Sequence, residues 1–453
     1  MLPKITNNFN SQFLGLSIYL LIFIRLNYFD YSLVQDEINF LQFSKGMSWF
    51  SSPPREYFGQ MFWTLLKALD FVSLGVFFAP LSKVFFSSLI LASLLLSIGF
   101  ARDGDNNKYV IFFALTSPFF YWSGKVIGPE VLSTFFIFLS LAALGSEKKY
   151  LSFLLVGAAV GVKLSAFPAL IFLLTIFLLS EQSRLRNCLA CLALSLVGFL
   201  LMNPTDFFGV FGRLASRVQT QNLDQLLSIP TYFFGSLFEI NELKFTWDLI
   251  PNTSFQDLSF GSVTLILILL ALIMERSKYF FPYLLFLFFQ IAWVLFGNSG
   301  QGFPWYWTSI LPITIYVFSH LNLQLELIRG VKKLPPLTLG AAIIAISFTI
   351  SIPTIIASIY QKDRQKSINA NYANDIACIR KNYGASGLPI VKRVDFRVSM
   401  DRYDYDIPNY QGGYLLVISD RFFQSNDEII IGPLKTPNRY LGKCGNLLAF
   451  QLG

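Results

Sequence analysis

Two carboxylates stand side by side a few residues after the first long apolar stretch of this chain, Asp36 and Glu37. Ionised carboxylates at the edge of a membrane are costly to keep there, so they often have a function. A carboxylate is able to act as a general base that takes a proton from an attacking hydroxyl or amine. The pair is therefore a candidate for chemistry, although a helix cap or a solvated loop explains such a pair equally well when it is seen alone.

A second carboxylate and three cations follow along the chain, namely Glu130 and Arg55, Lys125 and Lys163. Arginine can engage a phosphate through two parallel hydrogen bonds, and lysine acts on it as a point charge. Each residue also has a structural interpretation. Glu130 is suited to stabilise the start of a helix, Lys163 to reach the membrane interface, and Arg55 to pair with Glu56. Their expected position on one membrane face favours a phosphate-binding site.

Histidine chemistry is excluded from that face, because the one histidine, His320, is expected in a cytoplasmic loop. This excludes a Ser-His-Asp hydrolase and the usual histidine-bearing zinc sites. Asp36, Glu37 and Glu130 are able to hold a divalent metal ion, but their spacing does not require one. The cofactor therefore stays unassigned.

The elements that position these residues are membrane helices. The chain has 453 residues, of which 54% are apolar and 14% charged, whereas roughly a quarter of the residues of a soluble protein are charged. Its apolar runs are long enough for helical spans. The net charge of +8 is attributed to basic loops rather than to nucleic-acid binding, because no basic stripe with interleaved aromatic residues appears.

The apolar runs predict an all-α polytopic membrane protein with eleven spans, the first of them an uncleaved helix rather than a signal peptide. The predicted spans are 12–29, 81–100, 109–122, 131–145, 150–163, 165–180, 188–202, 259–274, 279–297, 305–319 and 337–358.

Alternate loops between these spans are basic, which predicts a cytoplasmic amino terminus and an extracytoplasmic carboxyl terminus. The outer side then holds the loops 30–80, 123–130 and 203–258. The basic residues of the inner loops are Arg102, Lys108, Lys148, Lys149, Arg184, Arg186, Arg276, Lys278, Arg329, Lys332 and Lys333.

The first outer loop contains an apolar, helix-like segment from Tyr57 to Phe71 that Lys67 and Asp70 interrupt. This pattern predicts an amphipathic helix lying on the membrane. A half of a transmembrane hairpin is the alternative, but it would invert every later loop and break the charge pattern.

Residues 1–358 are thus expected to form the transmembrane module, and residues 359–453 a small extracytoplasmic α/β domain. Strands are predicted at 414–418 and 428–431. Cys378 and Cys444 both fall in this tail, where the compartment is oxidising, so we predict a disulfide between them. Cys188 and Cys191 lie in a predicted span and are interpreted as small packing residues.

The order of the motifs resembles the GT-C superfamily of polytopic glycosyltransferases, in particular its protein O-mannosyltransferase and aminoarabinose-transferase-like branch. The likeness covers roughly the first 210 residues, and a weaker similarity is present at Trp305-Tyr306-Trp307. After the acidic pair, the motifs that carry it are Pro53-Pro54 before an aromatic helix, Ser117-Pro118 before an acidic residue, Gly157-Ala-Ala-Val-Gly161-Val-Lys163, and Asn203-Pro204.

The resemblance implies an inverting transfer of a sugar from a polyprenyl-phosphate donor at the outer face of a bacterial inner membrane. Asp36 matches the catalytic acidic residue of the first loop, and Glu37 matches its neighbour at the acceptor site. Glu130 stands where many members have Asp, and Lys163 matches a lysine that would bind the donor phosphate. The acceptor would be a glycan, a lipid or a protein. Membrane lipid is the other expected partner, and nucleic acid is not.

Two other functions stay open. A flippase or transporter for a lipid-linked saccharide would place polar sites near the middle of the membrane and often has repeated halves. A glycan polymerase or ligase also uses lipid-linked substrates. The sequence does not identify the sugar.

Overall fold

The structure is a computed structural model that describes part of the predicted helical module and part of the carboxyl-terminal tail. The described residues are 32–33, 40–41, 44, 48–50, 59–74, 78–100, 127–180, 185–205, 269, 272–273, 277–297, 309–321, 374–375, 377–379, 381–382, 390–393, 398–399, 414–419, 439–445 and 447–452. The predicted spans 12–29, 109–122 and 337–358, and nearly all of 259–274, lie outside these residues.

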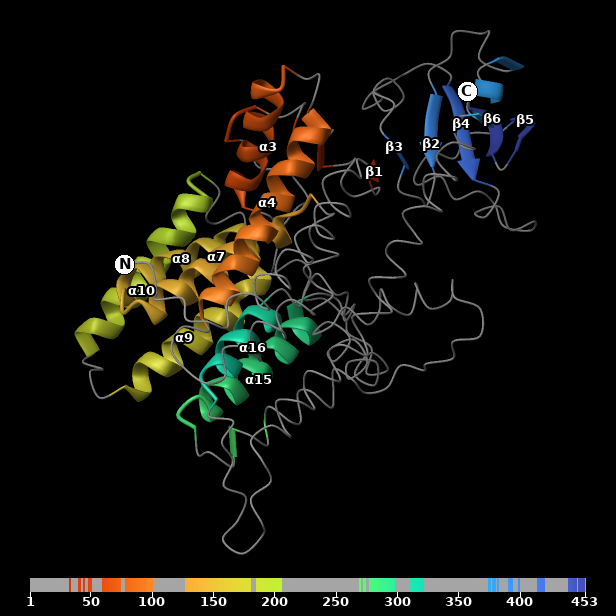
Figure 1. Ribbon diagram of the computed structural model, residues 1–453. Coiled ribbons are helices and arrows are strands. Elements are labelled where there is room, and N and C mark those ends of the chain that lie inside the picture. The colour runs from red at the N-terminus through yellow and green to blue at the C-terminus, as the bar shows by residue number, and fades with distance from the viewer. Residues whose placement is uncertain are drawn as a thin grey trace, which may run out of the picture. The chain divides into compact units, whose positions relative to one another are not determined.

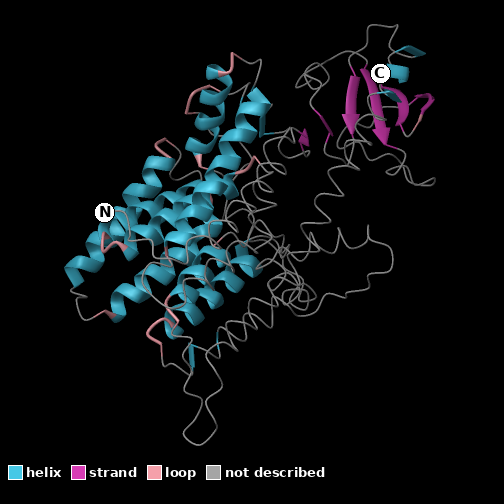
Figure 2. Cartoon of the chain, viewed as in Figure 1, coloured by secondary structure: helices cyan, strands magenta, loops and turns pink. Residues whose placement is uncertain are grey.

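The chain divides into two compact units, each described by itself. Unit 1 comprises residues 1–29 and 47–358, and unit 2 comprises residues 30–46 and 359–453. The labelled helices belong to unit 1 and the strands to unit 2 (Figures 1 and 2).

Unit 1 is a helical bundle. Seven of its helices coincide with predicted spans, so those seven predictions of helix are confirmed. A further helix, α3, coincides with the predicted surface helix, and a short 3₁₀ turn, η1, joins α8 to α9. The helices are α3 (Gln60–Val72), α4 (Phe78–Gly99), α7 (Pro129–Gly145), α8 (Lys149–Val162), η1 (Leu164–Ala166), α9 (Phe167–Leu179), α10 (Leu185–Met202), α15 (Phe280–Gly297) and α16 (Ile310–Ser319).

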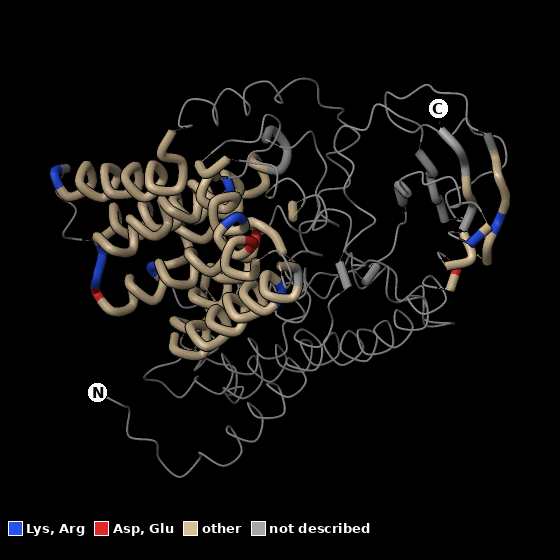
Figure 3. Tube along the Cα trace, turned by 90° about the horizontal axis from the view of Figure 1, so that it is seen from above, with Lys and Arg blue, Asp and Glu red and all other residues tan. Residues whose placement is uncertain are grey.

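The helices of unit 1 carry few charged residues (Figure 3). By length and composition, Pro80–Gly99 within α4 is the one described helix that is long and apolar enough to cross a membrane, and six others are apolar but shorter. One face of α10 exposes a row of leucines at helical spacing. Its members are Leu189, Leu192, Leu196 and Leu200.

Prolines mark where three helices begin or end. α7 starts at Pro129, where the missing N–H costs no hydrogen bond. Pro168 lies near the start of α9, and a continuous helix through it would bring its ring against the carbonyl of Leu164, so α8 ends at Val162 and α9 restarts. α10 ends at Met202, one residue before Asn203, which precedes Pro204 and is disfavoured in the helical conformation.

α8 and α10 pack with their backbones in close approach. A Cβ atom added to Gly157 would lie 2.0 Å from the Ser195 carbonyl oxygen, and one added to Gly198 would lie 2.1 Å from the Leu154 carbonyl oxygen. Only glycine therefore fits at these two positions, as is common where helices pack in membranes. Ser195 also donates a hydrogen bond of 3.1 Å from its hydroxyl to the Phe153 carbonyl across the pair.

α7 packs on the other side of α8 and is tied to it by serines. The Ser133 hydroxyl donates to the Ala159 carbonyl at 3.0 Å, and the Ser140 hydroxyl donates to the Ser152 carbonyl at 2.8 Å. The free thiols of Cys188 and Cys191 are buried in α10, in agreement with a packing role.

Unit 2 contains a four-stranded sheet of order β2-β4-β6-β5, in which β2 and β4 are parallel and the other neighbours antiparallel. The predicted strand at 414–418 is confirmed as β4, and the one at 428–431 lies outside the described residues. The strands are β2 (Ile390–Arg393), β4 (Tyr414–Ser419), β5 (Arg439–Cys444) and β6 (Leu447–Leu452), with a separate pair of β1 (Ser32–Leu33) and β3 (Val398–Ser399).

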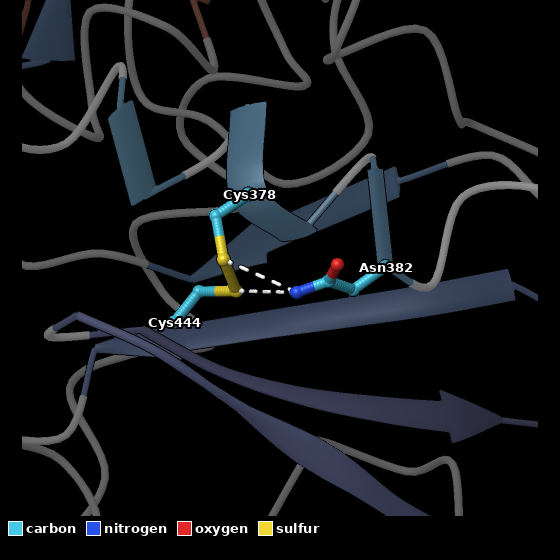
Figure 4. Close-up of a disulfide and its surroundings, with 3 residues drawn as sticks. All are labelled: Cys378, Asn382 and Cys444. Atoms are coloured by element: carbon cyan, nitrogen blue, oxygen red, sulfur yellow. Dashed lines mark hydrogen bonds between the residues drawn. A yellow bond between two sulfur atoms is a disulfide. The ribbon is translucent and has the colours of Figure 1, made fainter.

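A disulfide joins Cys378 to Cys444 at the end of β5, as expected from the sequence (Figure 4). The side-chain amide of Asn382 lies beside it, with its nitrogen 3.4 Å from the Cys378 sulfur and 3.7 Å from the Cys444 sulfur. The bond closes a segment of 66 residues, which lowers the entropy of the unfolded tail.

Candidate functional site

The structure brings Glu130 and Lys163 together as a salt bridge between the Lys163 ammonium and a Glu130 carboxylate oxygen. Glu130 lies in the first turn of α7, directly after Pro129, and Lys163 is the residue that caps the end of α8. Since α7 and α8 are antiparallel neighbours, the start of one helix meets the end of the other. We call this end of unit 1 the Lys163 end.

Both charges of this pair are largely removed from solvent. The Lys163 side chain is 6% exposed and the Glu130 side chain 19%. Burial disfavours the charged form of each side chain, and the opposite charge of its partner offsets this cost. Removal of either partner would leave a buried charge without compensation. The pair therefore holds the lysine charge at one place in the bundle.

The backbone around Lys163 is held from three directions. Its own N–H donates to the Ala159 carbonyl, and its carbonyl accepts a hydrogen bond from the N–H of Ala166, both at 3.0 Å. The Val162 carbonyl accepts a hydrogen bond of 2.9 Å from the N–H of Gly59, just before α3. Lys163 thus leaves α8 in an extended conformation whose flanking peptides are paired.

Two buried amides, Gln60 and Asn203, complete the Lys163 end. The Asn203 side chain accepts a hydrogen bond of 3.2 Å from the backbone N–H of Gln60 and donates one of 2.8 Å to the Gly161 carbonyl. Gln60 is 2% exposed and Asn203 is fully buried. These amides tie the start of α3 and the ends of α8 and α10 to one another.

Of the other predicted site residues, Asp36, Glu37, Arg55 and Lys125 lie outside the described residues. Their roles stay predictions. Within the part of the chain that the structure describes, no three His, Cys, Asp or Glu side chains come close enough to hold a metal ion.

Sequence reasoning missed several buried polar residues of unit 1. Lys83, in the first turns of α4, is only 2% exposed, and a lysine inside a predicted span was itself a signal of a constrained position. Asn203 was part of a quoted motif but had no assigned role. Nothing in the sequence marked Gln60 as a buried residue, because an amide side chain next to an aromatic helix is common. Ser165, between α8 and α9, has a buried hydroxyl with no hydrogen-bond partner among the described residues.

The arrangement fixes an ammonium group at a rigid helix end. An ammonium group attracts a phosphate as a point charge, but the Glu130–Lys163 pair as a whole is neutral, so an incoming phosphate competes with the Glu130 carboxylate for the ammonium. Such fixed charges stabilise charge that develops during a reaction.

Comparison with known proteins gives a match in fold. No known protein family and no curated protein matches the sequence. Among solved structures, the chain is similar to ArnT from Cupriavidus metallidurans in the apo state, at 11% identity and a TM-score of 0.57 over 98% of each chain. It is also similar to ArnT from the same organism bound to undecaprenyl phosphate, at 11% identity and a TM-score of 0.55 over 98% of each chain.

At this identity the likeness establishes the fold alone. The protein has the mostly helical fold of a polytopic membrane protein, so that prediction is confirmed. The predicted number of eleven spans extends beyond the described residues.

Proposed function

We propose that the protein is an inverting glycosyltransferase that moves a hexosyl or pentosyl group from a polyprenyl-phosphate donor to an acceptor. The observation that carries this proposal is the fold shared with ArnT over 98% of both chains, since one of the two ArnT structures holds undecaprenyl phosphate. The buried Glu130–Lys163 pair supports it, because it supplies a fixed cation suited to a phosphate. The motif order in the first 210 residues favours the same family.

Asp36 is proposed as the general base, and Glu37 as its neighbour at the acceptor site. Lys163, Arg55 and Lys125 are proposed to bind the donor phosphate. Glu130 has a more specific role in this scheme than the sequence suggested, because it contacts the Lys163 ammonium directly and orients it.

The reaction needs one displacement. The acceptor hydroxyl or amine loses its proton to Asp36 as its oxygen or nitrogen attacks the anomeric carbon. The bond between that carbon and the phosphate oxygen breaks with inversion, and the electron pair leaves with the polyprenyl phosphate. Lys163 stabilises the negative charge that grows on this leaving group. The proposed step uses only these side chains.

We place the reaction on the extracytoplasmic side of a bacterial inner membrane, with residues 359–453 as a soluble domain on the same side. The basic loops between alternate spans support this orientation. A lipid-linked donor also explains why the enzyme is embedded in the membrane, since the lipid tail stays in the bilayer while the sugar is presented at its surface.

The test replaces Asp36 by Asn in the purified full-length protein and follows sugar transfer from a polyprenyl-phosphate donor. Loss of the general base is expected to slow transfer by about 100- to 10,000-fold. Glu147→Gln is the matched control, because Glu147 is an exposed carboxylate in the turn between α7 and α8, and it should transfer at the native rate. Full activity of Asp36→Asn would defeat the assignment of the base.

The same preparation separates the enzyme from a flippase. In sealed vesicles a flippase moves lipid-linked sugar across the bilayer without forming a new glycosidic bond, whereas the proposed enzyme forms that bond without needing to move the lipid. Labelling with a membrane-impermeant reagent at a cysteine introduced beside Asp36 reports its side. Reaction from the cytoplasmic side alone would contradict the proposed orientation.

A further inference from the structure

The residues Gln60, Asn203 and Thr205 form a polar cluster at the Lys163 end, which we call the amide clamp. It joins four separate stretches of chain: the turn at Phe50, the start of α3, the end of α8 and the end of α10. No residue of the clamp was assigned a role by the sequence.

Gln60 uses both its side-chain amide and its backbone in the clamp. The side-chain nitrogen donates to the Phe50 carbonyl and to the Thr205 hydroxyl. The side-chain oxygen accepts a hydrogen bond of 2.9 Å from the Thr205 N–H. The backbone N–H of Gln60 donates to Asn203. A buried amide with every group paired is held in one orientation, because each lost hydrogen bond would leave a buried polar atom unsatisfied.

Asn203 connects this amide to the end of α8. The last carbonyls of a helix have no partner within the helix and need one from elsewhere. In α8 the Gly161 carbonyl accepts a hydrogen bond from the Asn203 side-chain amide, and the Val162 carbonyl accepts one from the backbone N–H of Gly59. The approach is so close that a Cβ atom on Gly59 would lie 2.2 Å from the Gly161 carbonyl oxygen. The two carbonyls that precede Lys163 are therefore fixed, one by Asn203 of the clamp and the other by the N–H of Gly59 next to Gln60.

We propose that Asn203 and Gln60 are positioning residues that act through Lys163. They hold the end of α8 so that the Lys163 ammonium stays where it meets the donor phosphate, and Glu130 contacts the ammonium itself. This inference rests on the proposed function. It assigns to two uncharged residues an effect on donor binding, although neither is proposed to touch the donor.

The experiment is a double-mutant cycle on the binding of undecaprenyl phosphate to the full-length protein in detergent micelles. Asn203→Leu removes the side-chain hydrogen bonds without adding charge, and Lys163→Gln removes the ammonium. Lys163→Gln is expected to weaken binding by about 10- to 100-fold, as for the loss of a hydrogen bond to a charged group. Asn203→Leu is expected to weaken it by about tenfold in the native background, and by less than about twofold in the Lys163→Gln background.

Ser195→Ala is the matched control for a purely structural effect. Ser195 also ties α10 to α8 by a buried hydrogen bond, but to Phe153, far along α8 from Lys163. Its replacement is expected to leave carrier affinity unchanged in both backgrounds. If Asn203→Leu does not fold, Gln60→Met tests the same clamp, because it keeps the backbone N–H that binds Asn203.

The outcomes separate this inference from the function on which it rests. If Lys163→Gln weakens binding but the effect of Asn203→Leu persists undiminished in the double variant, the clamp does not act through Lys163 and the inference is overturned while the phosphate site stands. If Lys163→Gln binds the carrier as tightly as the native protein, the phosphate assignment itself fails. If Asn203→Leu weakens carrier binding in the native background but not in the Lys163→Gln background, the positioning role is supported.

Discussion

The two ends of the helix α16 lie in different surroundings. At its start, the Ser309 hydroxyl lies 2.7 Å from the Gln290 side-chain oxygen and 3.4 Å from the Ser165 carbonyl, close in sequence to Lys163. At its other end, ~15 Å away for a ten-residue helix, the His320 ring lies 4.4 Å from the Tyr316 ring and 5.0 Å from the Tyr279 ring. We call this second region the His320 end.

A charge is kept in a defined place at only one of these two ends. Contacts at the Lys163 end are directional, since they are amide hydrogen bonds and a salt bridge, and they fix both distance and angle. At the His320 end, the contacts between helices are mostly between rings, which tolerate several geometries at similar energy. The His320 Nδ1 lies 2.8 Å from the Tyr316 carbonyl oxygen and 3.0 Å from the Ser319 hydroxyl, but both residues belong to the same helix, α16. Only the first kind of end is suited to place a cation against a phosphate, and the predictions below test this contrast.

The largest expected effect comes from breaking the salt bridge. Glu130→Ala leaves the Lys163 ammonium buried without its carboxylate, which costs about 3–5 kcal/mol of stability. Thermal unfolding in detergent measures this loss. Glu130→Gln removes the same charge and should cost nearly as much, because its amide oxygen accepts a hydrogen bond from the lysine but does not compensate the ammonium. Native stability of Glu130→Gln would show that the charge of Glu130 is not what holds Lys163.

A second variant moves the Lys163 end without changing any polar residue. Gly198→Leu forces α10 away from the Leu154 carbonyl of α8, and overpacking of this kind costs about 1–3 kcal/mol. Because the end of α8 should shift with it, carrier affinity is also expected to fall. Gly145→Leu is the control, since a Cβ atom there meets nothing within 4 Å. Unchanged stability of Gly198→Leu would contradict the close packing.

The smallest effect is expected at the His320 end. His320→Phe keeps a ring against Tyr316 and Tyr279, and it should change stability by less than about 1 kcal/mol and leave carrier affinity unaltered. Burial lowers the pKa of His320 in the folded protein, so the histidine is protonated more readily in the unfolded chain than in the folded one. Native stability should therefore fall as the pH drops below about 6.5, and His320→Phe should lose this dependence. A large loss of carrier affinity in this variant would show that the His320 end also takes part in binding the carrier.

Much of the fold followed from local signals in the sequence. The helices α4, α7, α8, α9, α10, α15 and α16 begin and end within a few residues of the predicted spans, because long apolar runs and prolines act on the chain locally. The disulfide between Cys378 and Cys444 followed from the compartment expected for the tail. The site was predicted only in part. Glu130 and Lys163 were chosen as separate residues with different roles, not as a pair.

By itself, the sequence determined which segments are apolar helices and which residues carry charge near their ends, since both depend on composition over a short stretch. Tertiary structure alone decided that Glu130 meets Lys163 across 33 positions and that Asn203 reaches Gly161 across 42. These two contacts depend on how closely α7, α8 and α10 pack. That distance is set by glycines and serines that lie far apart in the chain. An amide such as Gln60 carries no local signal of its partners, because its hydrogen bonds exist only after the helices have packed.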